Sequence, residues 1–395
     1  MTDDLSLQIA DRVKGLSESP TIAVMDKARK LKAAGQPVVD LSGGDPDFDT
    51  APHVTEAAIA ALKNGFTHYT PSRGIPELLK AIVDKTEREN SASYITKEVL
   101  VTPGAKTALY TAAQAIINPG DEAILFDPCW VSYDPCIELA GGKSVYVTMD
   151  TSTTLNELKK SLEKAVTKRT RMMILNTPNN PSGFVWTKEQ LEVVADFVQA
   201  NNMYVLSDEI YEKLIFEDMP HVSIASLPGM TKHTLVLNGL SKSHAMTGWR
   251  MGWMLGPEKV MSEMLKIHSH SSTCAASFVQ KGAVAALEGP QEYTNYMVGR
   301  YKTRRDNLAT GLNKISGIHC ESPAGAFYAF PDVSKTGMSD MDFASQLLEK
   351  ELVATTPGSA FGPGGEGHIR LSFANSDEML AEAVVRIERF VSNIK

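Results

Sequence analysis

Short apolar, β-prone runs recur along the middle of the chain and constrain its fold more than any other feature. They occupy residues 123–126, 172–175, 204–207, 234–237 and 249–255. Helical patterns separate most of them, and strands that alternate with helices favour a mostly parallel sheet covered on both faces. In such sheets, ligands bind at the carboxyl ends of the strands. We therefore expect an α/β fold whose functional side chains follow successive strands.

The last hundred residues have a different pattern. A long helical stretch over 290–312 precedes strand patterns at 326–330 and 368–373 and a terminal amphipathic helix. This order indicates a smaller α+β domain. We predict three parts: an N-terminal arm with part of the small domain (1–48), a large domain (49–290) and the small C-terminal domain (291–395).

Composition limits the class of protein. The 395 residues are enough for two domains, and a formal net charge of −8 argues against general nucleic-acid binding. No apolar run approaches the roughly 20 residues that a membrane span needs, and residues 1–12 lack a signal-peptide core. The four cysteines form no CxxC pair, so neither a zinc ribbon, a redox dithiol nor disulfides are indicated. We expect a cytoplasmic protein without nucleic-acid, membrane or metal partners.

A lysine and an arginine follow the apolar run at 234–240. Lys242 stands just after the run, and Arg250 follows in a glycine-flanked stretch. Burial at the end of a strand lowers the pKa of a lysine, which suits it to a Schiff base with a carbonyl compound. An arginine held nearby can bind a phosphate by a two-point contact. Together the two residues indicate a pyridoxal-phosphate enzyme.

Asp208 directly follows the run at 204–207, where a carboxylate can pair with a protonated pyridine nitrogen. Tyr211 stands three residues later, on the same side of a predicted helical turn, and can hydrogen-bond a phenolate oxygen. A helix N-cap aspartate with a core tyrosine explains the same residues. Glu209 is a second candidate carboxylate, and the spacing to Tyr211 favours Asp208.

Gly104, Ala105 and Lys106 follow a strand pattern at 99–101 and open a predicted helix with a proline near its first turn. The free N–H groups and the dipole of such a helix start make an anion site, although an ordinary capped helix explains the sequence as well. The Gly-Pro-Gly-Gly stretch at 362–365 fits a turn better than a second phosphate loop.

Other single residues carry weaker signals. Trp130 can stack on a planar cofactor or fill the core, and Asn180 stands in a tight Asn-Pro-Ser-Gly turn. Arg370 alternates with apolar residues, so a contact with a substrate carboxylate and an ion pair with a protein carboxylate both explain it. His268 and His270 form an HxH pair, but without a third ligand nearby, ordinary histidines are favoured over a metal site.

Seven segments carry a family resemblance across nearly the whole chain. They are SGGDPDFDT (42–50), YTPSRGIPEL (69–78), PCWVSY (128–133), NNPSG (179–183), SDEIY (207–211), SKSHAMTGWR (241–250) and RLSF (370–373). Together they resemble the fold-type I, class I aminotransferases, and most closely the prokaryotic-type aspartate aminotransferase subgroup. The resemblance implies a mostly parallel, seven-stranded sheet in a large pyridoxal-phosphate domain, with a smaller α+β domain. It is less specific for the substrate.

Carried over by position, the resemblance assigns roles to these residues. It makes Lys242 the Schiff-base lysine and proton shuttle, and it pairs Asp208 with the pyridine nitrogen. Tyr211 and Asn180 hold the phenolate oxygen in this arrangement, and Trp130 stacks on the ring. The implied phosphate-binding residues are Gly104, Ala105, Lys106, Ser241, Arg250 and, from a neighbouring subunit, Tyr69, which implies a homodimer.

The resemblance also implies how substrate is held. Arg370 clamps the α-carboxylate, and the neighbouring groups are Asn180, Trp130 and the Gly44 backbone. In the aspartate-using subgroup, a lysine at the Lys106 position recognises the distal carboxylate. The small hydroxyl residues that assist it match Ser19 and Thr21 here.

We therefore expect ping-pong transamination of L-aspartate with 2-oxoglutarate, through a Schiff base at Lys242 and a pyridoxamine intermediate. Departures from the common pattern at Asp45, Arg73 and 268–273 leave prephenate, aromatic and other amino acids open. Arg73 could offer a second carboxylate contact or lie at the subunit interface. A β-lyase on the same apparatus is a further alternative, and a non-catalytic cofactor-binding regulator is a remote one.

Overall fold

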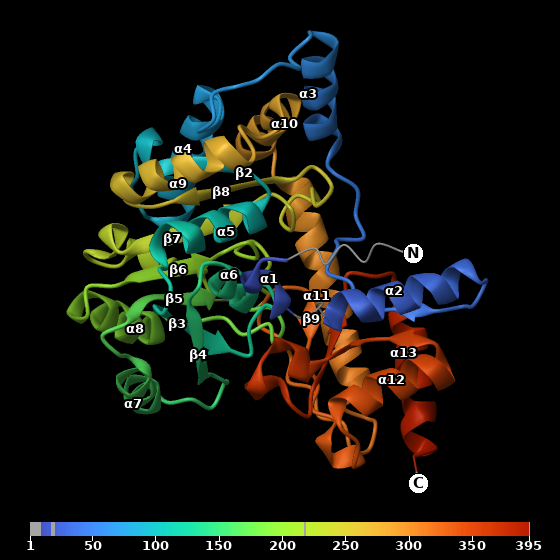
Figure 1. Cartoon of the computed structure of the whole chain (residues 1–395). Helices are drawn as coiled ribbons and strands as arrows, with labels where there is room; N and C mark the ends of the chain where they lie inside the picture. The colour runs from blue at the N-terminus through green and yellow to red at the C-terminus, as the bar shows by residue number, and fades with distance from the viewer. Residues whose placement is uncertain (1–8, 17–19, 217–218, 395) are drawn as a thin grey trace, which may run out of the picture.

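A seven-stranded sheet forms the centre of the larger part of the molecule (Figure 1). The structure is a computed structural model that describes residues 9–16, 20–216 and 219–394. The strand order is β2-β8-β7-β6-β5-β3-β4, and β8 runs antiparallel to both of its neighbours while the other paired strands are parallel. The strands are β2 (Val99–Pro103), β3 (Glu122–Asp127), β4 (Lys143–Thr148), β5 (Thr170–Asn176), β6 (Tyr204–Asp208), β7 (Thr234–Gly239) and β8 (Met251–Leu255). The predicted α/β class with a mostly parallel seven-stranded sheet is confirmed.

Helices cover both faces of this sheet, so its central strands are apolar on both sides. Alternate residues of β2 show the division: Leu100 packs in one core cluster, whereas Val99 and Val101 pack in another. One face is covered by α5 (Ala105–Ile116), α6 (Tyr133–Leu139) and α9 (Glu258–Ser271). The other is covered by α3 (Pro52–Lys63), α4 (Pro76–Asn90), α7 (Leu155–Ala165), α8 (Lys188–Ala200) and α10 (Ser277–Glu288).

The smaller part combines short strands with long helices, as predicted, and lies at the lower right of Figure 1. Its strands are β9 (Tyr328–Ala329), β11 (Thr356–Pro357) and β12 (Ile369–Ser372) in one antiparallel sheet, and β1 (Val39–Asp40) parallel to β10 (Val353–Ala354). Its helices are α2 (Pro20–Ala33), α11 (Glu292–Leu312), α12 (Asp340–Glu351) and α13 (Asp377–Ser392). The β1–β10 pair brings the N-terminal region to this part, while the domain boundaries at 48 and 290 stay predictions.

The two parts share a core beside the carboxyl end of β6. Tyr211 and Phe216, which follow that strand, pack in one cluster with Phe327 and Phe373 of the smaller part. The rings of Tyr211 and Phe327 meet edge to face, with centroids 5.5 Å apart. This contact fixes the residues after β6 against the smaller part.

Helix starts differ in a way that bears on function. Thr187 caps α8 by accepting a bond from the Gln190 amide, and the Gln190 side chain bonds back to the Thr187 amide. In contrast, α5 begins at Ala105 after Gly104 with no side-chain cap. The proline expected in its first turn, Pro103, is instead the last residue of β2, because the strand runs on to the glycine that turns the chain. The start of α5 therefore keeps its first amides for another partner.

The short helix α1 (Asp11–Lys14) lies near the start of the described residues. Among the described residues, no helix combines the length and the apolar character that a bilayer span requires.

Candidate functional site

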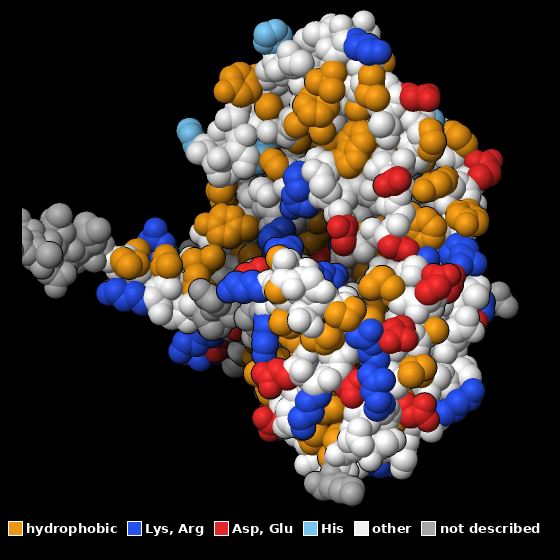
Figure 2. Space-filling view, turned by 90° about the vertical axis from the view of Figure 1, so that its right-hand side faces the viewer, with side chains coloured by type: hydrophobic (Ala, Val, Ile, Leu, Met, Phe, Trp, Pro, Cys, Tyr) orange, Lys and Arg blue, Asp and Glu red, His pale blue; other side chains and the backbone are white. Residues whose placement is uncertain are grey.

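A cavity of about 370 Å³ lies where the carboxyl ends of the sheet strands meet the smaller part. Its lining residues are Gly44, Asp45, Ala105, Lys106, Trp130, Tyr133, Asn176, Asn180, Asp208, Ile210, Tyr211, Ser241, Lys242, Thr247, Arg250, Tyr328 and Arg370. Among the described side chains, the structure therefore brings together every predicted site residue except Gly104, which adjoins the lining, and Tyr69. Figure 2 shows Lys and Arg side chains around a recess between the two parts of the molecule.

Lys242 lies in the turn that follows β7. Its Nζ donates a hydrogen bond to the carbonyl of Gly44 and lies 5.6 Å from the centroid of the Phe327 ring. Burial lowers the pKa of Lys242 to about 8, with Arg370 and Arg250 acting in the same direction and Asp45 opposing them. A lysine with this pKa has a neutral fraction at physiological pH, which a nucleophile or a base requires.

Asp208 is the last residue of β6 and is buried. Its Oδ2 accepts a hydrogen bond of 2.7 Å from the Tyr133 hydroxyl, and its Oδ1 accepts one of 3.2 Å from the Ile210 amide. Burial raises the pKa of Asp208 to about 6, against the Tyr133 hydrogen bond, which lowers it. Asp208 lines the cavity and forms no ion pair with the described residues, so this buried carboxylate suits a protonated ring nitrogen.

Glu209, the second candidate carboxylate, lies outside this cavity. It accepts hydrogen bonds from the hydroxyls of Ser207 (2.9 Å) and Ser223 (2.7 Å), and it lies 3.0 Å from Nε2 of His221. These contacts hold the Glu209 carboxylate against Ser207, Ser223 and His221, away from the cavity. The turn that follows, residues 210–213, is not the helical turn expected from the sequence, although it still brings Tyr211 into the cavity with Asp208.

Arg370 is buried on β12 and faces the cavity. It donates hydrogen bonds to Oδ1 of Asn180 (2.9 Å) and to the Ser42 carbonyl (2.7 Å), whereas its Nε has no hydrogen-bond partner in the described part of the chain. Its guanidinium lies over the rings of Tyr328 (4.5 Å) and Phe361 (4.8 Å). The partners found for it are an amide, a carbonyl and two rings, so a carboxylate entering the cavity can take a fork-shaped contact.

The start of α5 and Arg250 form a second cationic end of the cavity. Gly104 has φ of 84°, and a Cβ built on it would lie 2.5 Å from Nη2 of Arg250. Arg250 is held by a 3.0 Å hydrogen bond from Nη1 to the Thr247 carbonyl. The guanidinium therefore packs directly on the uncapped helix start, with Ser241 also lining the cavity. Helix amides, a hydroxyl and an arginine are a donor set for a phosphate.

Tyr69 is 87% exposed and does not line the cavity of its own chain. Its expected contact with a phosphate from a neighbouring subunit stays a prediction. Ser19 and the side chain of Thr21, which the resemblance placed near the distal carboxylate, lie outside the described residues.

Two residues with open roles lie elsewhere. Nη1 of Arg73 donates to the carbonyls of Lys97 (2.7 Å) and Val99 (2.9 Å), so it is engaged by the backbone at the start of β2 rather than by the cavity. His268 is fully buried in α9, whereas His270 is exposed, so the two rings do not converge on one point.

Tyr133 and Tyr328 are site residues that the sequence reasoning missed. Tyr133 stands in the PCWVSY segment with Trp130, and the two rings meet edge to face at 5.6 Å. Tyr328 falls in the strand pattern at 326–330, and its hydroxyl lies 3.0 Å from that of Tyr211. Proximity to recognised segments was the only sequence signal for either residue.

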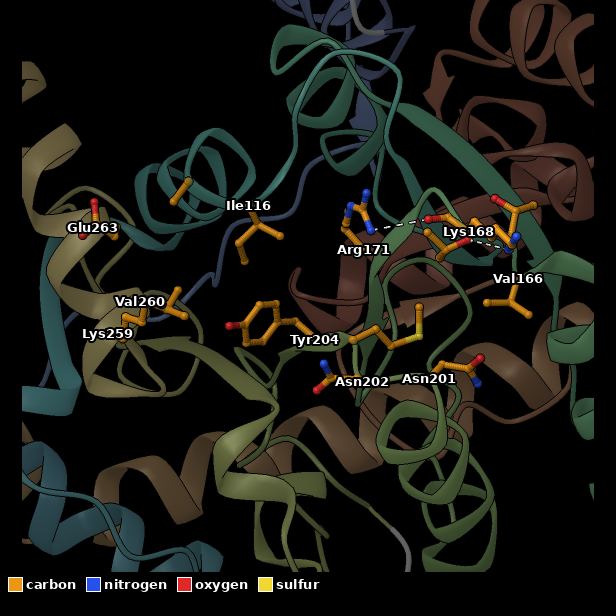
Figure 3. Close-up of a pocket in the computed structure, with 14 residues that line it drawn as sticks. Ile116, Val166, Lys168, Arg171, Asn201, Asn202, Tyr204, Lys259, Val260 and Glu263 are labelled. Atoms are coloured by element: carbon orange, nitrogen blue, oxygen red, sulfur yellow. Dashed lines mark hydrogen bonds between the residues drawn. The ribbon is translucent and has the colours of Figure 1, made fainter.

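A larger cavity, of about 660 Å³, lies at the opposite, amino-terminal edge of β5 and β6 (Figure 3). Arg171 lines it and is engaged with Asp121 at 2.9 Å, and the other lining groups include Asn202, Tyr204 and Lys259. None of the predicted site residues contributes to it. The smaller cavity, with its buried carboxylate, lysine and arginine, is the candidate active site.

The family model for class I and II aminotransferases matches residues 36–387. The chain belongs to this family. Its members depend on pyridoxal phosphate and act on amino acids and oxo acids, so the chain is a pyridoxal-phosphate-dependent aminotransferase.

Known aminotransferases match along almost the whole length. The aspartate aminotransferase of Musicola paradisiaca is 42% identical over 386 residues, which cover 97% of this chain and 96% of that protein. The aspartate/prephenate aminotransferase of Nitrosomonas europaea is 40% identical over 399 residues, with 98% of this chain and 100% of that protein covered. The structure of Thermus thermophilus aspartate aminotransferase with maleate has a TM-score of 0.90 and 40% identity, with 97% and 99% covered.

The donor set fits the cofactor of this aminotransferase family. The cavity offers a buried carboxylate at one point, a cradle of helix amides and Arg250 at another, and Lys242 with its lowered pKa. Pyridoxal phosphate, when bound, supplies an aldehyde that takes up amino groups and a pyridinium ring that withdraws electrons from the substrate.

Proposed function

We propose that the chain transfers the amino group of L-aspartate to 2-oxoglutarate, giving oxaloacetate and L-glutamate in two half-reactions. The observation that carries this proposal is the charge of the cavity. Two carboxylates line it, Asp45 and Asp208, against four cationic side chains: Lys106, Lys242, Arg250 and Arg370. This excess of positive charge suits a phosphate together with a dicarboxylic substrate.

The residues that would contact the cofactor ring and its phenolate oxygen have distinct roles in this proposal. Asp208 holds a proton on the ring nitrogen, which keeps the ring an electron sink. Asn180 already accepts from Arg370 through Oδ1, which leaves its Nδ2 as a donor toward the phenolate oxygen. The Tyr211 hydroxyl is the second donor to that oxygen, and Trp130 packs on the ring face.

Lys242 moves the proton. Its neutral Nζ would hold the cofactor, whose aldehyde reacts with amines, and the same amine, when free, would be the base that takes the proton from the substrate Cα. The Gly44 carbonyl, which accepts from Nζ, holds the amine on the side of the cavity shared with Arg370.

The phosphate is held by the backbone amides of Ala105 and Lys106, by Ser241 and by Arg250. Tyr69 of the partner subunit completes this set in a homodimer. The high exposure of Tyr69 in the single chain supports a role outside its own cavity.

Two cationic side chains bind the carboxylates of the substrate in this proposal. Arg370 takes the α-carboxylate, beside Asn180, the Gly44 backbone and Trp130. The ammonium of Lys106 lies 4.8 Å from the centroid of the Trp130 ring, and burial lowers the pKa of Lys106. An incoming distal carboxylate favours the charged form of this lysine, which makes Lys106 the group that selects a dicarboxylic donor.

The test is a single half-reaction followed by substitution of Lys106. The cofactor-loaded protein, given L-aspartate without a keto acid, should lose its visible absorbance and release one oxaloacetate per chain. Lys106→Met should raise the KM for L-aspartate by about 10- to 100-fold, because a charge-assisted contact is lost. Its KM for an aromatic donor should change little, and Lys242→Ala provides the inactive reference.

Prephenate and aromatic amino acids form the second candidate substrate class. One relative is named an aspartate/prephenate aminotransferase, and aromatic rings of Trp130 and Tyr133 line the cavity. A larger kcat/KM with these compounds than with L-aspartate and 2-oxoglutarate would overturn the dicarboxylic assignment. Release of pyruvate and ammonia from an amino acid alone would instead indicate a β-lyase, and no half-reaction with any amino acid would indicate a regulator.

A further inference from the structure

Tyr328 connects three groups of the candidate site that come from distant parts of the chain. It lies on β9, opposite Ser372 of β12, and is 1% exposed. Its ring supports Arg370, whose guanidinium carbon lies 4.5 Å from the ring centroid. The strand pairing therefore fixes the ring beneath the arginine that takes the substrate α-carboxylate.

The hydroxyl of Tyr328 reaches the other side of the site. It lies 3.0 Å from the hydroxyl of Tyr211. A Cβ built on Gly44 would lie 2.4 Å from the same hydroxyl oxygen, so the Gly44 backbone packs directly against it. Since the Gly44 carbonyl accepts from Lys242, one hydroxyl contacts both the tyrosine that faces the cofactor and the backbone that holds the lysine.

The number of protons that the two hydroxyls can donate determines which tyrosine is the donor in the hydrogen bond between them. Each hydroxyl has one proton to donate. When Tyr211 donates its proton to the phenolate oxygen of the cofactor, only Tyr328 can donate across the 3.0 Å contact. A hydroxyl that accepts a hydrogen bond becomes a stronger donor, because successive bonds polarise one another.

Arg370 acts on this pair through its charge. Burial raises the pKa of both tyrosines, and the Arg370 cation lowers the pKa of each. A carboxylate bound to Arg370 cancels part of that positive charge, which makes Tyr328 a weaker donor to Tyr211.

We propose that Tyr328 is a positioning residue that couples the occupancy of Arg370 to the strength with which Tyr211 donates to the cofactor oxygen. The coupling rests on the roles proposed above for Arg370 and Tyr211, but not on the identity of the amino donor. Binding of a substrate carboxylate thereby changes the basicity of the reacting centre through the protein as well as through space.

The first test removes only the hydroxyl. In Tyr328→Phe, the ring under Arg370 remains, while Tyr211 loses its donor. The visible absorbance of the cofactor-loaded protein is titrated with pH, without substrate. The apparent pKa of the colour change should rise by about 0.5 to 1 pH unit, because the phenolate oxygen is stabilised less.

Tyr301→Phe is the matched control. Tyr301 is also fully buried in the shared core, and the charged groups that act on its hydroxyl are Asp47 and Arg304 rather than Arg370. It does not line the cavity. An unchanged titration is expected for this variant, and a shift as large as that of Tyr328→Phe would contradict a specific role for Tyr328.

A non-reacting dicarboxylate tests the coupling itself. Saturating succinate should raise the apparent pKa in the parent protein, and the rise should be smaller in Tyr328→Phe, because only the direct electrostatic effect is left. In steady-state assays with the preferred amino donor, kcat should fall about 3- to 10-fold, with less than about a 3-fold change in KM, since the ring under Arg370 is kept.

A double-variant cycle provides the second, independent measurement. If Tyr328 acts through Tyr211, Tyr328→Phe should leave the titration unchanged in a Tyr211→Phe background. Additive shifts, or an unshifted titration in Tyr328→Phe with normal cofactor binding, would overturn the proposal. Because the titration needs no substrate, failure of L-aspartate as a donor affects the proposed reaction and leaves this test intact.

Discussion

At the scale of single residues, the candidate site contains ionisable side chains whose burial disfavours their charged forms. Burial raises the pKa of Asp208 to about 6 and lowers that of Lys242 to about 8. Both shifts move the group toward its neutral form, so both represent a stability cost in the protein without its cofactor. In the proposed arrangement, the cofactor would relieve that cost, as a cation beside Asp208 and a covalent partner for Lys242.

The stability cost of burying Asp208 changes with pH in a definite direction. Its folded-state pKa lies above the usual value of 3.8, so between about pH 4 and 6 the folded state binds more protons than the unfolded state. The free energy of unfolding therefore falls as the pH rises through this window, and the loss is complete above about pH 6.

Asp208→Asn removes this titration while keeping an acceptor for Tyr133. We expect the cofactor-free variant to be more stable than the cofactor-free parent at pH 7.5, by on the order of 1–3 kcal/mol. Urea unfolding at several pH values measures the difference, which should shrink as the pH falls from 6 to 4. A difference that stays constant over this range would contradict the assigned pKa. Bound cofactor should reverse the order of stability.

Some of the residues found from the sequence share one property, which is that they directly follow an apolar run. Asp208 and Lys242 have this signal because a polar group at the end of a buried strand is unusual. Tyr133 and Tyr328 lack it, because their hydroxyls meet Asp208 and Tyr211 across 75 and 117 residues of chain. Such contacts depend on the packing of elements that are far apart in the chain, which no local pattern encodes.

At the scale of elements, strands that are buried on both faces are predictable, whereas the exposed edge strand β4 is not. The central strands read as continuous apolar runs because helices cover both faces. The edge strand β4 has only one buried residue, Val147, and its sequence KSVYVT gives no such run. The helix start at Gly104 was recognisable as an anion site, yet its contact with Arg250 required β2 and β8 to pair.

Gly104→Ala tests the contact between α5 and Arg250. The new Cβ would lie 2.5 Å from Nη2 of Arg250, and alanine is strained at φ of 84°. We expect the cofactor dissociation constant to rise at least 10-fold as Arg250 is pushed from the helix start. Absorbance titration of the cofactor-free protein with pyridoxal phosphate measures it.

Gly120→Ala is the matched control for this prediction. Gly120 also has φ of 84°, but nothing lies within 4 Å of a Cβ built there. Both variants should lose about 1 kcal/mol of stability from backbone strain. Weaker cofactor binding in both would show that general destabilisation, rather than the Arg250 contact, is responsible.

At the scale of the whole molecule, one chain contains nearly all of the candidate site and leaves Tyr69 outside it. Segments from both parts line the cavity, including Gly44 from the N-terminal region and Arg370 from β12. Tyr69 is 87% exposed and does not line the cavity of its own chain. A homodimer in which Tyr69 enters the site of the partner subunit explains this exposure.

Hybrid dimers decide between a role for Tyr69 in its own chain and a role across the interface. Tyr69→Ala alone should weaken cofactor binding about 10-fold or more, since a hydrogen bond to a charged phosphate is lost, and Lys242→Ala alone should be inactive. In a hybrid of the two chains, the site with an intact Lys242 receives the intact Tyr69 of the other chain if the contact crosses the interface. At low cofactor concentration, this site should bind and react as in the parent protein. If Tyr69 acts in its own chain, the same site lacks its tyrosine, and the hybrid should be no better than the Tyr69→Ala homodimer.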